Sequence, residues 1–285
     1  MPSFSFKYEN FGDFIDEVAD ESIPTWEGYR ASQEDSGDWS GNVNVKKAIK
    51  LARFGWREGR EMMHTELELA HNATAFDRLP SFAYDVAGYM PNVPLYVAGC
   101  PAHMMSPLGN EKAQEKVVEI KVNISASCGN NADTLMRRGA SILSLIDKLE
   151  DAGLSCQLTI VEYTRASSSG RGYFLMEFPI KKAGQPMDID RCAYALVHPS
   201  MLRKLTFVKT EQTLKAKAGW QGGYGTPADL PYHMRHGCVY FPTVDRMKES
   251  EMKYQMDKTI SIYENQTSGK DWDGSLLDDK YAHTS

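Results

Sequence analysis

The sequence lacks the long apolar stretches that mark membrane and secreted proteins. No apolar run in its 285 residues reaches the ~18 residues that a membrane-spanning helix requires. The first residues, MPSFSFKYENFGDF, contain neither the basic nor the apolar segment of a secretory signal. We therefore expect a cytoplasmic protein with no membrane partner. Its content of 42% hydrophobic and 25% charged residues is ordinary for a globular protein. A chain of 285 residues is long enough for one large domain or two modest ones.

Metal-binding and catalytic signatures are also missing. The five cysteines are odd in number and widely spaced, without a C-x-x-C pair, so they indicate reduced thiols rather than disulfides or a zinc framework. The chain contains no G-x-S-x-G, no Walker-type phosphate loop, no G-x-G-x-x-G and no H-E-x-x-H. We therefore expect no cofactor, and nothing in these patterns argues for an enzyme.

Charge is present but divided unevenly along the chain. Residues 1–45 hold ten acidic against two basic residues, a formal charge of −8. Residues 165–219 hold ten basic against four acidic residues, a formal charge of +6. The net charge of −6 therefore conceals an acidic segment and a basic one, and each could recognise a different partner.

The most regular pattern in the sequence is a strand, a helix and a second strand. Residues 117–127 are dense in β-branched and apolar residues, which favours a buried strand. Residues 134–153 place their leucines and isoleucines on one helical stripe, with Asp133 as the expected N-cap and Gly153 at the expected stop. Residues 154–164 return to the strand pattern. This order predicts a βαβ unit with two parallel strands and a right-handed crossover.

Further elements follow this unit. Residues 173–182 alternate strictly and should complete a β-hairpin with the preceding strand. Residues 187–199 predict a short helix that Pro199 stops, residues 202–210 a strand, and residues 237–242 a last strand.

The N-terminal part is predicted to be mainly helical. Residues 3–10 favour a short strand, residues 11–20 a helix, and residues 45–70 a long helix that bends at Gly55 or Gly59. Five prolines between residues 78 and 107 predict loops and short extended pieces that wrap the core. We expect one compact unit made of three parts: an N-terminal helical and irregular wrap (1–110), an α/β core (111–215), and a C-terminal loop, strand and helical arm (216–285).

The element order across roughly residues 115–211 resembles the von Willebrand factor A domain. In that family a D-x-S-x-S loop holds a divalent metal with help from a downstream Thr and Asp; the loop here reads Asn123, Ser125 and Ser127, with Thr210 and Glu211 downstream. The resemblance implies an α/β fold with a mixed sheet and a von Willebrand A-like core. Because hard cations prefer carboxylate oxygens, the amide at Asn123 makes the motif degenerate, and we expect no bound metal.

The same loop offers an anion-binding alternative. It precedes the predicted N-terminus of a helix, where backbone N–H groups attract phosphate. Arg137 and Arg138 follow in the first turns of that helix, a position that the helix dipole disfavours for cations. An anion held by Ser125, Ser127, Arg137 and Arg138 would explain these arginines, and ordinary solvated or paired arginines remain the other interpretation.

The basic segment 165–219 suggests a nucleic-acid contact. Cationic side chains can follow a phosphate backbone while aromatic rings stack on unpaired bases, which is the chemistry of single-strand binding. An ordinary solvated face is the other interpretation of these lysines. The predicted contacts are Arg165, Arg171, Tyr173, Lys181, Lys182, Trp220 and Tyr224.

The whole chain also resembles a family of uncharacterised proteins from phages and mobile elements. The resemblance rests on four blocks: WSGN, AIKLARFGWREG (48–59), YDVAGYMPNVPLYVAGCPAHM (84–104) and RRGASILSLIDKLEDAG (137–153). It implies a viral or mobile-element setting, and so the cytoplasm of a host cell.

These observations predict a non-enzymatic, phage-encoded binding protein. We expect an accessory factor in viral transcription or replication that contacts single-stranded DNA, a polymerase, or both. The alternative is a protein–protein adaptor that uses the 123–127 loop and the acidic N-terminus without touching nucleic acid. A hydrolase or nuclease with an unrecognised site is the third interpretation.

Overall fold

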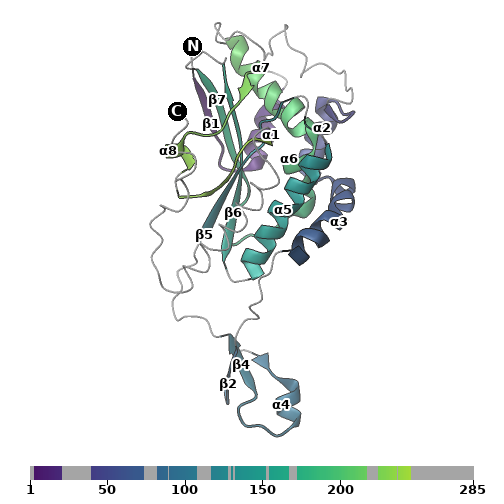
Figure 1. Ribbon diagram of the computed structural model, residues 1–285, viewed down its shortest axis with the longest axis vertical. Helices are drawn as coiled ribbons and strands as arrows, with labels where there is room; N and C mark the ends of the chain where they lie inside the picture. The colour runs from purple at the N-terminus through teal and green to yellow at the C-terminus, as the bar shows by residue number, and fades with distance from the viewer. Residues whose placement is uncertain are drawn as a thin grey trace.

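The chain folds into a large mixed α/β body and a small separate sheet (Figure 1). The computed structural model describes residues 3–20, 40–73, 82–88, 90–107, 117–127, 130, 132–151, 154–166, 172–216, 224–235 and 237–244. The elements, in chain order, are β1 (Phe4–Lys7), α1 (Phe11–Val18), α2 (Val45–Phe54), α3 (Arg57–Ala73), β2 (Phe82–Asp85), β3 (Met90–Pro91), α4 (Val93–Val97), β4 (Met104–Pro107), β5 (Val117–Asn123), α5 (Ala132–Asp151), β6 (Ser155–Arg165), β7 (Tyr173–Lys181), α6 (Ile189–Val197), the π-helix η2 (Met201–Thr206), α7 (Phe207–Ala216), β8 (Thr226–Pro227), α8 (Tyr232–Arg235) and β9 (Val239–Phe241).

The main sheet is mixed and mostly parallel, with the order β1-β7-β6-β5-β9 and β8 paired to the end of β6. The predicted βαβ unit is confirmed, because β5 and β6 are parallel neighbours joined by α5, with Ile120 opposite Leu158. The predicted hairpin is confirmed as well, since β6 and β7 pair antiparallel. The predicted strands at residues 3–10 and 237–242 form β1 and β9, which pair parallel with β7 and β5.

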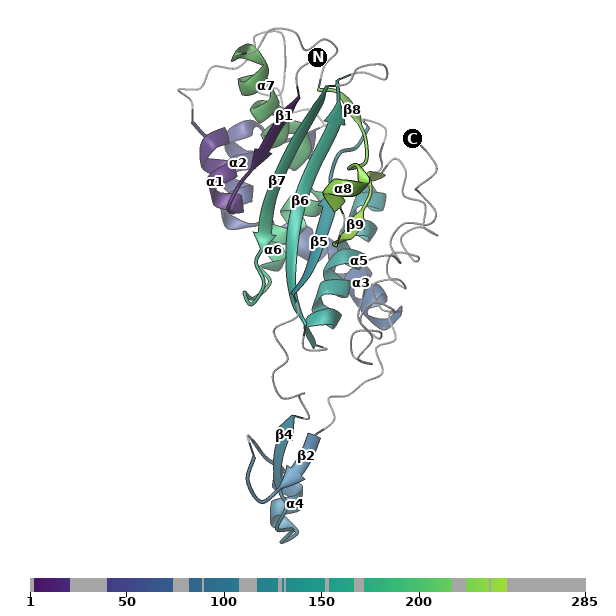
Figure 2. The ribbon, with the colours of Figure 1, turned by 90° about the vertical axis from the view of Figure 1, so that its left-hand side faces the viewer.

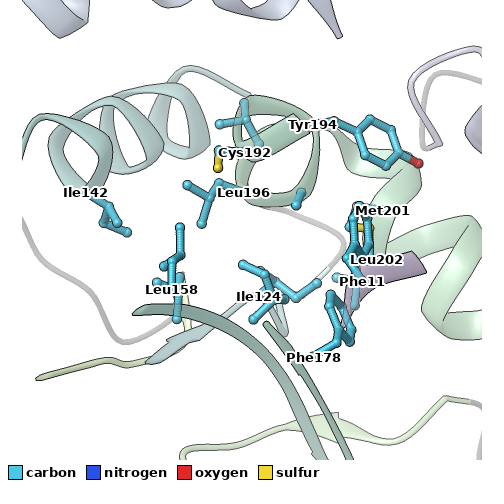
Figure 3. Close-up of a cluster of buried hydrophobic side chains, with 14 of the residues drawn as sticks. Phe11, Ile124, Ile142, Leu158, Phe178, Cys192, Tyr194, Leu196, Met201 and Leu202 are labelled. Atoms are coloured by element: carbon cyan, nitrogen blue, oxygen red, sulfur yellow. The ribbon is translucent and has the colours of Figure 1, made fainter. Parts of the chain in front are cut away.

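Helices cover one face of this sheet, and the short C-terminal elements cover the other (Figure 2). Apolar side chains from β5, β6 and β7 meet those of α5, α6 and η2 in the main core, where Ile142, Leu158 and Phe178 are fully buried (Figure 3). On the opposite face Val161 and Tyr163 pack in a smaller cluster with Leu230 and Tyr240. Because both faces are covered, the central strands read as nearly continuous apolar runs.

Helix boundaries follow local chemistry, with one departure from prediction. The predicted helix 11–20 forms α1, and the side chain of Asn10 accepts a hydrogen bond from Asp13 N as its N-cap. The expectation that Asp133 caps α5 is wrong: the helix already begins at Ala132, so Asp133 is its second residue. The expected stop at Gly153 lies outside the described residues.

The long helix predicted at residues 45–70 is interrupted at Gly55, one of the two expected positions. Gly55 separates α2 from α3 with a φ of +87°, a left-handed conformation that favours glycine. Gly59, the other expected position, lies within α3. Trp56 N then donates to Asp190 O at 2.9 Å, which ties the break to the start of α6.

The strand predicted at residues 202–210 is wrong, because this segment is helical. It forms η2 and the start of α7, with Leu202, Leu205 and Val208 buried at three-residue spacing. The Thr206 hydroxyl donates to Leu202 O at 2.8 Å and the Thr210 hydroxyl to Thr206 O at 3.0 Å, four residues back in each case. The burial of apolar residues three apart marks one face of a helix that packs against the core, despite the β-branched residues.

Residues 82–107 do not wrap the core as expected. They form a separate three-stranded antiparallel sheet in the order β2-β4-β3, with α4 beside it, and the ribbon places this unit away from the main sheet (Figure 2). We call it the small module. The tail helix expected at residues 245–266 lies outside the described residues. None of the helices within the described ranges has the length and apolar character needed to cross a membrane.

Candidate ligand-binding site

The carboxyl ends of β5 and β6 lie side by side and open onto a cavity. Open α/β sheets usually bind ligands outside the carboxyl ends of their parallel strands. Here β6 runs past the end of β5, and β8 pairs with this extension through Thr164 and Arg165. The 124–127 loop, η2, the start of α7 and β8 surround a cavity of about 270 Å³. Its lining residues are Ser125, Ala126, Ser127, Thr164, Leu202, Arg203, Phe207, Tyr224, Gly225, Thr226 and Pro227.

An aromatic pair forms one wall of this cavity. The rings of Phe207 and Tyr224 are stacked, with centroids 3.8 Å apart and planes 7° from parallel. The Tyr224 hydroxyl donates to Glu211 Oε1 at 2.6 Å, which fixes the orientation of the ring. Thr210 and Glu211, which the metal motif would need in a loop after a strand, are instead buried residues of the helix α7.

Arg203 supplies the only charge among the described residues that line the cavity. Its side chain is only 8% exposed, and its guanidinium donates to the backbone oxygen of Ser127 at 3.3 Å. The guanidinium therefore links η2 to the loop after β5 at the margin of the cavity.

The first two residues of the degenerate metal motif are engaged in structural hydrogen bonds. Asn123 is fully buried and its amide nitrogen donates to Ala228 O at 2.8 Å and to the Tyr240 hydroxyl at 3.0 Å. The buried Ser125 hydroxyl donates to Tyr163 O and accepts from Tyr163 N. The amide thus serves as a donor, which a carboxylate cannot do.

An aspartate at position 123 would therefore not simply restore a metal ligand. It would place a carboxylate oxygen against the Ala228 carbonyl oxygen, with no hydrogen between them. Among the described residues, no group of three His, Cys, Asp or Glu side chains is arranged to hold a metal ion.

The two arginines proposed for an anion lie in different environments. Arg138 is 2% exposed, and its guanidinium donates to the backbone oxygens of Asn123, Phe241 and Pro242 at 3.0, 3.4 and 2.7 Å. Burial lowers the pKa of Arg138 to about 10. Arg138 therefore ties α5 to the ends of β5 and β9, whereas Arg137 is exposed on α5.

The predicted nucleic-acid residues fall at two distant ends of the hairpin. Arg165 is exposed and Tyr173 half-buried, and the two are cross-strand partners at the end nearest the cavity. Lys181 and Lys182 lie at the other end of β7, about 30 Å away at 3.3 Å per residue. Arg171 and Trp220 lie outside the described residues.

Several cations of the basic segment are buried rather than presented to solvent. Lys181 is 3% exposed and its ammonium donates to Glu150 Oε1 at 2.5 Å and to Cys156 O at 3.0 Å. Lys209 is also buried and donates to Glu17 Oε1 at 2.5 Å. The formal charge of the segment thus overstates the positive charge that a ligand can meet.

Sequence reasoning missed a buried carboxyl group on the central strand. Glu162 is completely buried, and neither carboxyl oxygen has a hydrogen-bond partner among the described residues. The Thr206 hydroxyl lies beside this carboxyl group but gives its hydrogen to Leu202 O. Burial raises the pKa of Glu162 to about 8, with Thr206 opposing the shift. A lone Glu in the apolar run LTIVEYT was the available signal.

Sequence reasoning also missed an exposed apolar surface. The small module exposes Tyr84, Val86, Val93, Tyr96 and Val97, the last by 78%, and α4 buries no residue. Isolated exposed apolar residues are ordinary, but five within one small module are typical of an interaction surface.

Comparison with known proteins identifies the family but no activity. A family model described as "Domain of unknown function (DUF7192)" matches residues 2–267, so the chain belongs to this family. No curated protein and no solved structure matches the chain.

Proposed function

We propose that this member of the DUF7192 family is a non-enzymatic protein that binds single-stranded nucleic acid at the carboxyl edge of its main sheet. The supporting observation is that two cation–aromatic pairs lie at this edge: Arg203 and Tyr224 line the cavity, and Arg165 pairs with Tyr173 at the end of the β6–β7 hairpin. Cations for the phosphates and rings for the bases are what such binding requires.

The path of the strand follows from the pleat of β6. Neighbouring residues of a strand point to opposite faces, so Thr164 lies on the helix-covered face and Arg165 on the face of Tyr163. Tyr173 pairs with Arg165 and shares its face. A bound strand would therefore cross the edge of the sheet, from the cavity to the Arg165–Tyr173 pair.

The setting that we propose is a phage or mobile element, on the four sequence blocks given above, with the host cytoplasm as the compartment. We further propose a von Willebrand A-like core. The order of strand, S-x-S loop, helix, strand, antiparallel strand and helix supports it, whereas the helical conformation of residues 202–210 counts against it.

The test is oligonucleotide binding measured by fluorescence anisotropy over a range of salt concentrations. We expect single strands to bind better than duplexes, with affinity that falls as salt rises. Arg165→Ala should flatten the salt dependence by about one phosphate contact. Lys182→Ala is the matched control: it removes one exposed cation at the far end of β7 and should leave binding unchanged.

The outcome that contradicts the proposal is equally specific. If the protein binds no single strand at low salt, or if Arg165→Ala and Lys182→Ala have the same effect, the edge is not a nucleic-acid site.

The adaptor function is the second candidate, and the small module favours it. Its described residues carry few charges, and Tyr96 and Val97 are 64% and 78% exposed on α4. A photo-crosslinking amino acid at position 96 would test this function in host cells. We expect one discrete crosslinked protein, lost when Val97 is changed to Asp; diffuse or absent crosslinking would reject the adaptor.

A further inference from the structure

We infer that the tip of the small module, residues 92–103, inserts into the interfacial region of a lipid bilayer. The tip contains α4 and lies at the end of the small module that points away from the main sheet (Figure 2). Such a peripheral contact needs no membrane-spanning helix. It is separate from the proposed nucleic-acid site, and it gives the exposed surface of α4 a lipid partner in place of the protein that the adaptor function needs.

The tip belongs to a stretch of sequence that is almost without charge. Residues 79–110 contain no Glu, Lys or Arg and one Asp, although 25% of the whole chain is charged. That residue, Asp85, lies on β2 outside the tip, and its carboxylate accepts a hydrogen bond from Val86 N at 2.6 Å. Charged side chains are costly to place in lipid, so a tip of this composition can enter the apolar boundary without that cost.

The start of α4 provides its own hydrogen bonds. The side-chain oxygen of Asn92 accepts from Leu95 N at 3.2 Å, and the backbone oxygen of Asn92 accepts from Tyr96 N at 2.9 Å. Pro94, in the first turn, has no N–H to satisfy. The N–H groups that a helix start usually leaves to water are therefore bonded here within the tip.

The end of α4 is closed in a similar way. Gly99, with a φ of +73°, turns the chain so that Cys100 N donates to Leu95 O and Gly99 N donates to Tyr96 O, both at 3.0 Å. His103 Nδ1 then donates to Cys100 O at 2.9 Å. Backbone groups without partners are costly in lipid, where no water can bond to them. This closure removes a main cost of placing the two ends of a helix in lipid.

The side chains of α4 suit lipid better than the groove of one protein. Val93, Tyr96 and Val97 are 61%, 64% and 78% exposed, and α4 buries no residue. At ~100° per residue, these three and the exposed Pro94 cover nearly half of the circumference of the helix. A helix bound in a protein groove presents one narrower stripe, whereas lipid surrounds every side that enters it. Tyr96 adds a ring with a polar hydroxyl, a residue type that is enriched at membrane interfaces.

The test is flotation of the full chain with lipid vesicles at low and high salt. Vesicles of pure phosphatidylcholine are compared with vesicles that also contain anionic phosphatidylserine. Because the tip has no charge, we expect binding to phosphatidylcholine that does not weaken as the salt concentration rises. No flotation with either vesicle, or flotation with the anionic vesicles alone that high salt abolishes, would overturn the inference and leave the nucleic-acid proposal untouched.

Two variants assign the binding to α4. Val97→Asp should weaken binding to phosphatidylcholine vesicles by at least about tenfold, because it brings a charge into the interface. Phe54→Asp is the matched control, since Phe54 is 77% exposed on α2 in the main body and should not affect vesicle binding. Circular dichroism checks that both variants fold. Equal binding by the two variants would show that α4 is not the contact.

A fluorophore on Cys100 locates the contact by a second measurement. Cys100 is exposed in the tip, whereas the other described cysteines are buried, and Cys128→Ser removes the one that remains. An environment-sensitive label should shift its emission to shorter wavelength when vesicles are added, and an unchanged spectrum on floating protein would contradict insertion. Sedimentation velocity tests the competing occupant. A dimer without lipid that Val97→Asp abolishes would mean that α4 contacts a second copy, and the inference would be wrong.

Discussion

Glu162 stands out at the residue scale because it places an ionisable group where ionisation is costly. Its carboxyl group is fully buried in β6, and its pKa is raised from 4.5 to about 8. The folded state therefore holds a proton that the unfolded state has already released at neutral pH. The tighter binding of this proton stabilises the folded state fully below pH 4.5. The stabilisation decreases as the pH rises and is lost above about pH 8.

We predict that Glu162→Gln removes this pH dependence. Between pH 5 and pH 8 the free energy of unfolding should decrease more for the wild type than for the variant. The difference should be about 4 kcal/mol, since each pKa unit corresponds to about 1.4 kcal/mol. Urea denaturation of both proteins at several pH values measures the difference, in which all other titrating groups cancel. A difference that stays constant with pH would show that Glu162 titrates normally.

Buried charges are also the residues that sequence reasoning placed least well. The sequence pattern predicts Lys181 as a nucleic-acid contact, yet its ammonium is buried and pairs with Glu150, 31 residues earlier. Arg138 reaches the backbone oxygens of residues 241 and 242, more than 100 residues later. Periodicity describes only near neighbours, so partners this remote leave no signal in a local pattern.

Gly55 is the position at which one element becomes two. Gly55 follows the last residue of α2 and has a φ of +87°. A Cβ added to it would lie 2.6 Å from the Cβ of Asp190. Both backbone strain and a steric clash therefore oppose any side chain at this position.

We predict that Gly55→Ala lowers the free energy of unfolding by roughly 2–4 kcal/mol, the sum of a strained φ and an overpacked contact. Gly184→Ala is the matched control. Gly184 has a φ of +73° and nothing within 4 Å of an added Cβ, so it isolates the strain, which costs roughly 1 kcal/mol. Thermal and urea denaturation measure both variants. Equal losses would mean that the contact with Asp190 contributes nothing.

Element type was predictable where the apolar period was unambiguous, as in α5 with its long stripe and in the alternating β7. It was not predictable at residues 202–210. Leu202, Phe207 and Val208 stand among lysines and threonines in an order that suits either a strand or a helix, and packing against the core decides in favour of the helix.

At the scale of the whole molecule, the C-terminal elements complete the fold. β9 pairs with β5, and Leu230 and Tyr240 cover Val161 and Tyr163 on the face that the helices leave open. The Tyr240 hydroxyl also accepts from Asn123 and from Leu230 N.

We predict that a chain ending at residue 223 does not fold, because it exposes the second face of the sheet and loses β9. Its circular dichroism should show no cooperative thermal transition. Val97→Ser in the full chain is the contrasting change: Val97 is 78% exposed in the small module, so the melting temperature should stay unchanged. Cooperative melting of the shortened chain would mean that residues 1–223 are sufficient for the fold.

The sequence led to the correct central unit and to the loop after β5, but not to the cavity. The cavity combines the 124–127 loop with side chains of η2, α7 and β8, up to 103 residues further along the chain. Only the folded sheet brings these four segments together.

The pairing of β1 with β7 has a consequence for how the protein is made. β1 comprises residues 4–7, yet its hydrogen-bonding partner is residues 174–177. At a synthesis rate of about 5–20 residues per second, the first strand leaves the ribosome roughly ten seconds or more before its partner. Throughout that interval Phe4, Phe11 and Phe14, all buried in the finished protein, have no sheet to cover them. β1 can therefore join the sheet only after β7 has been synthesised, so this edge of the sheet is completed late.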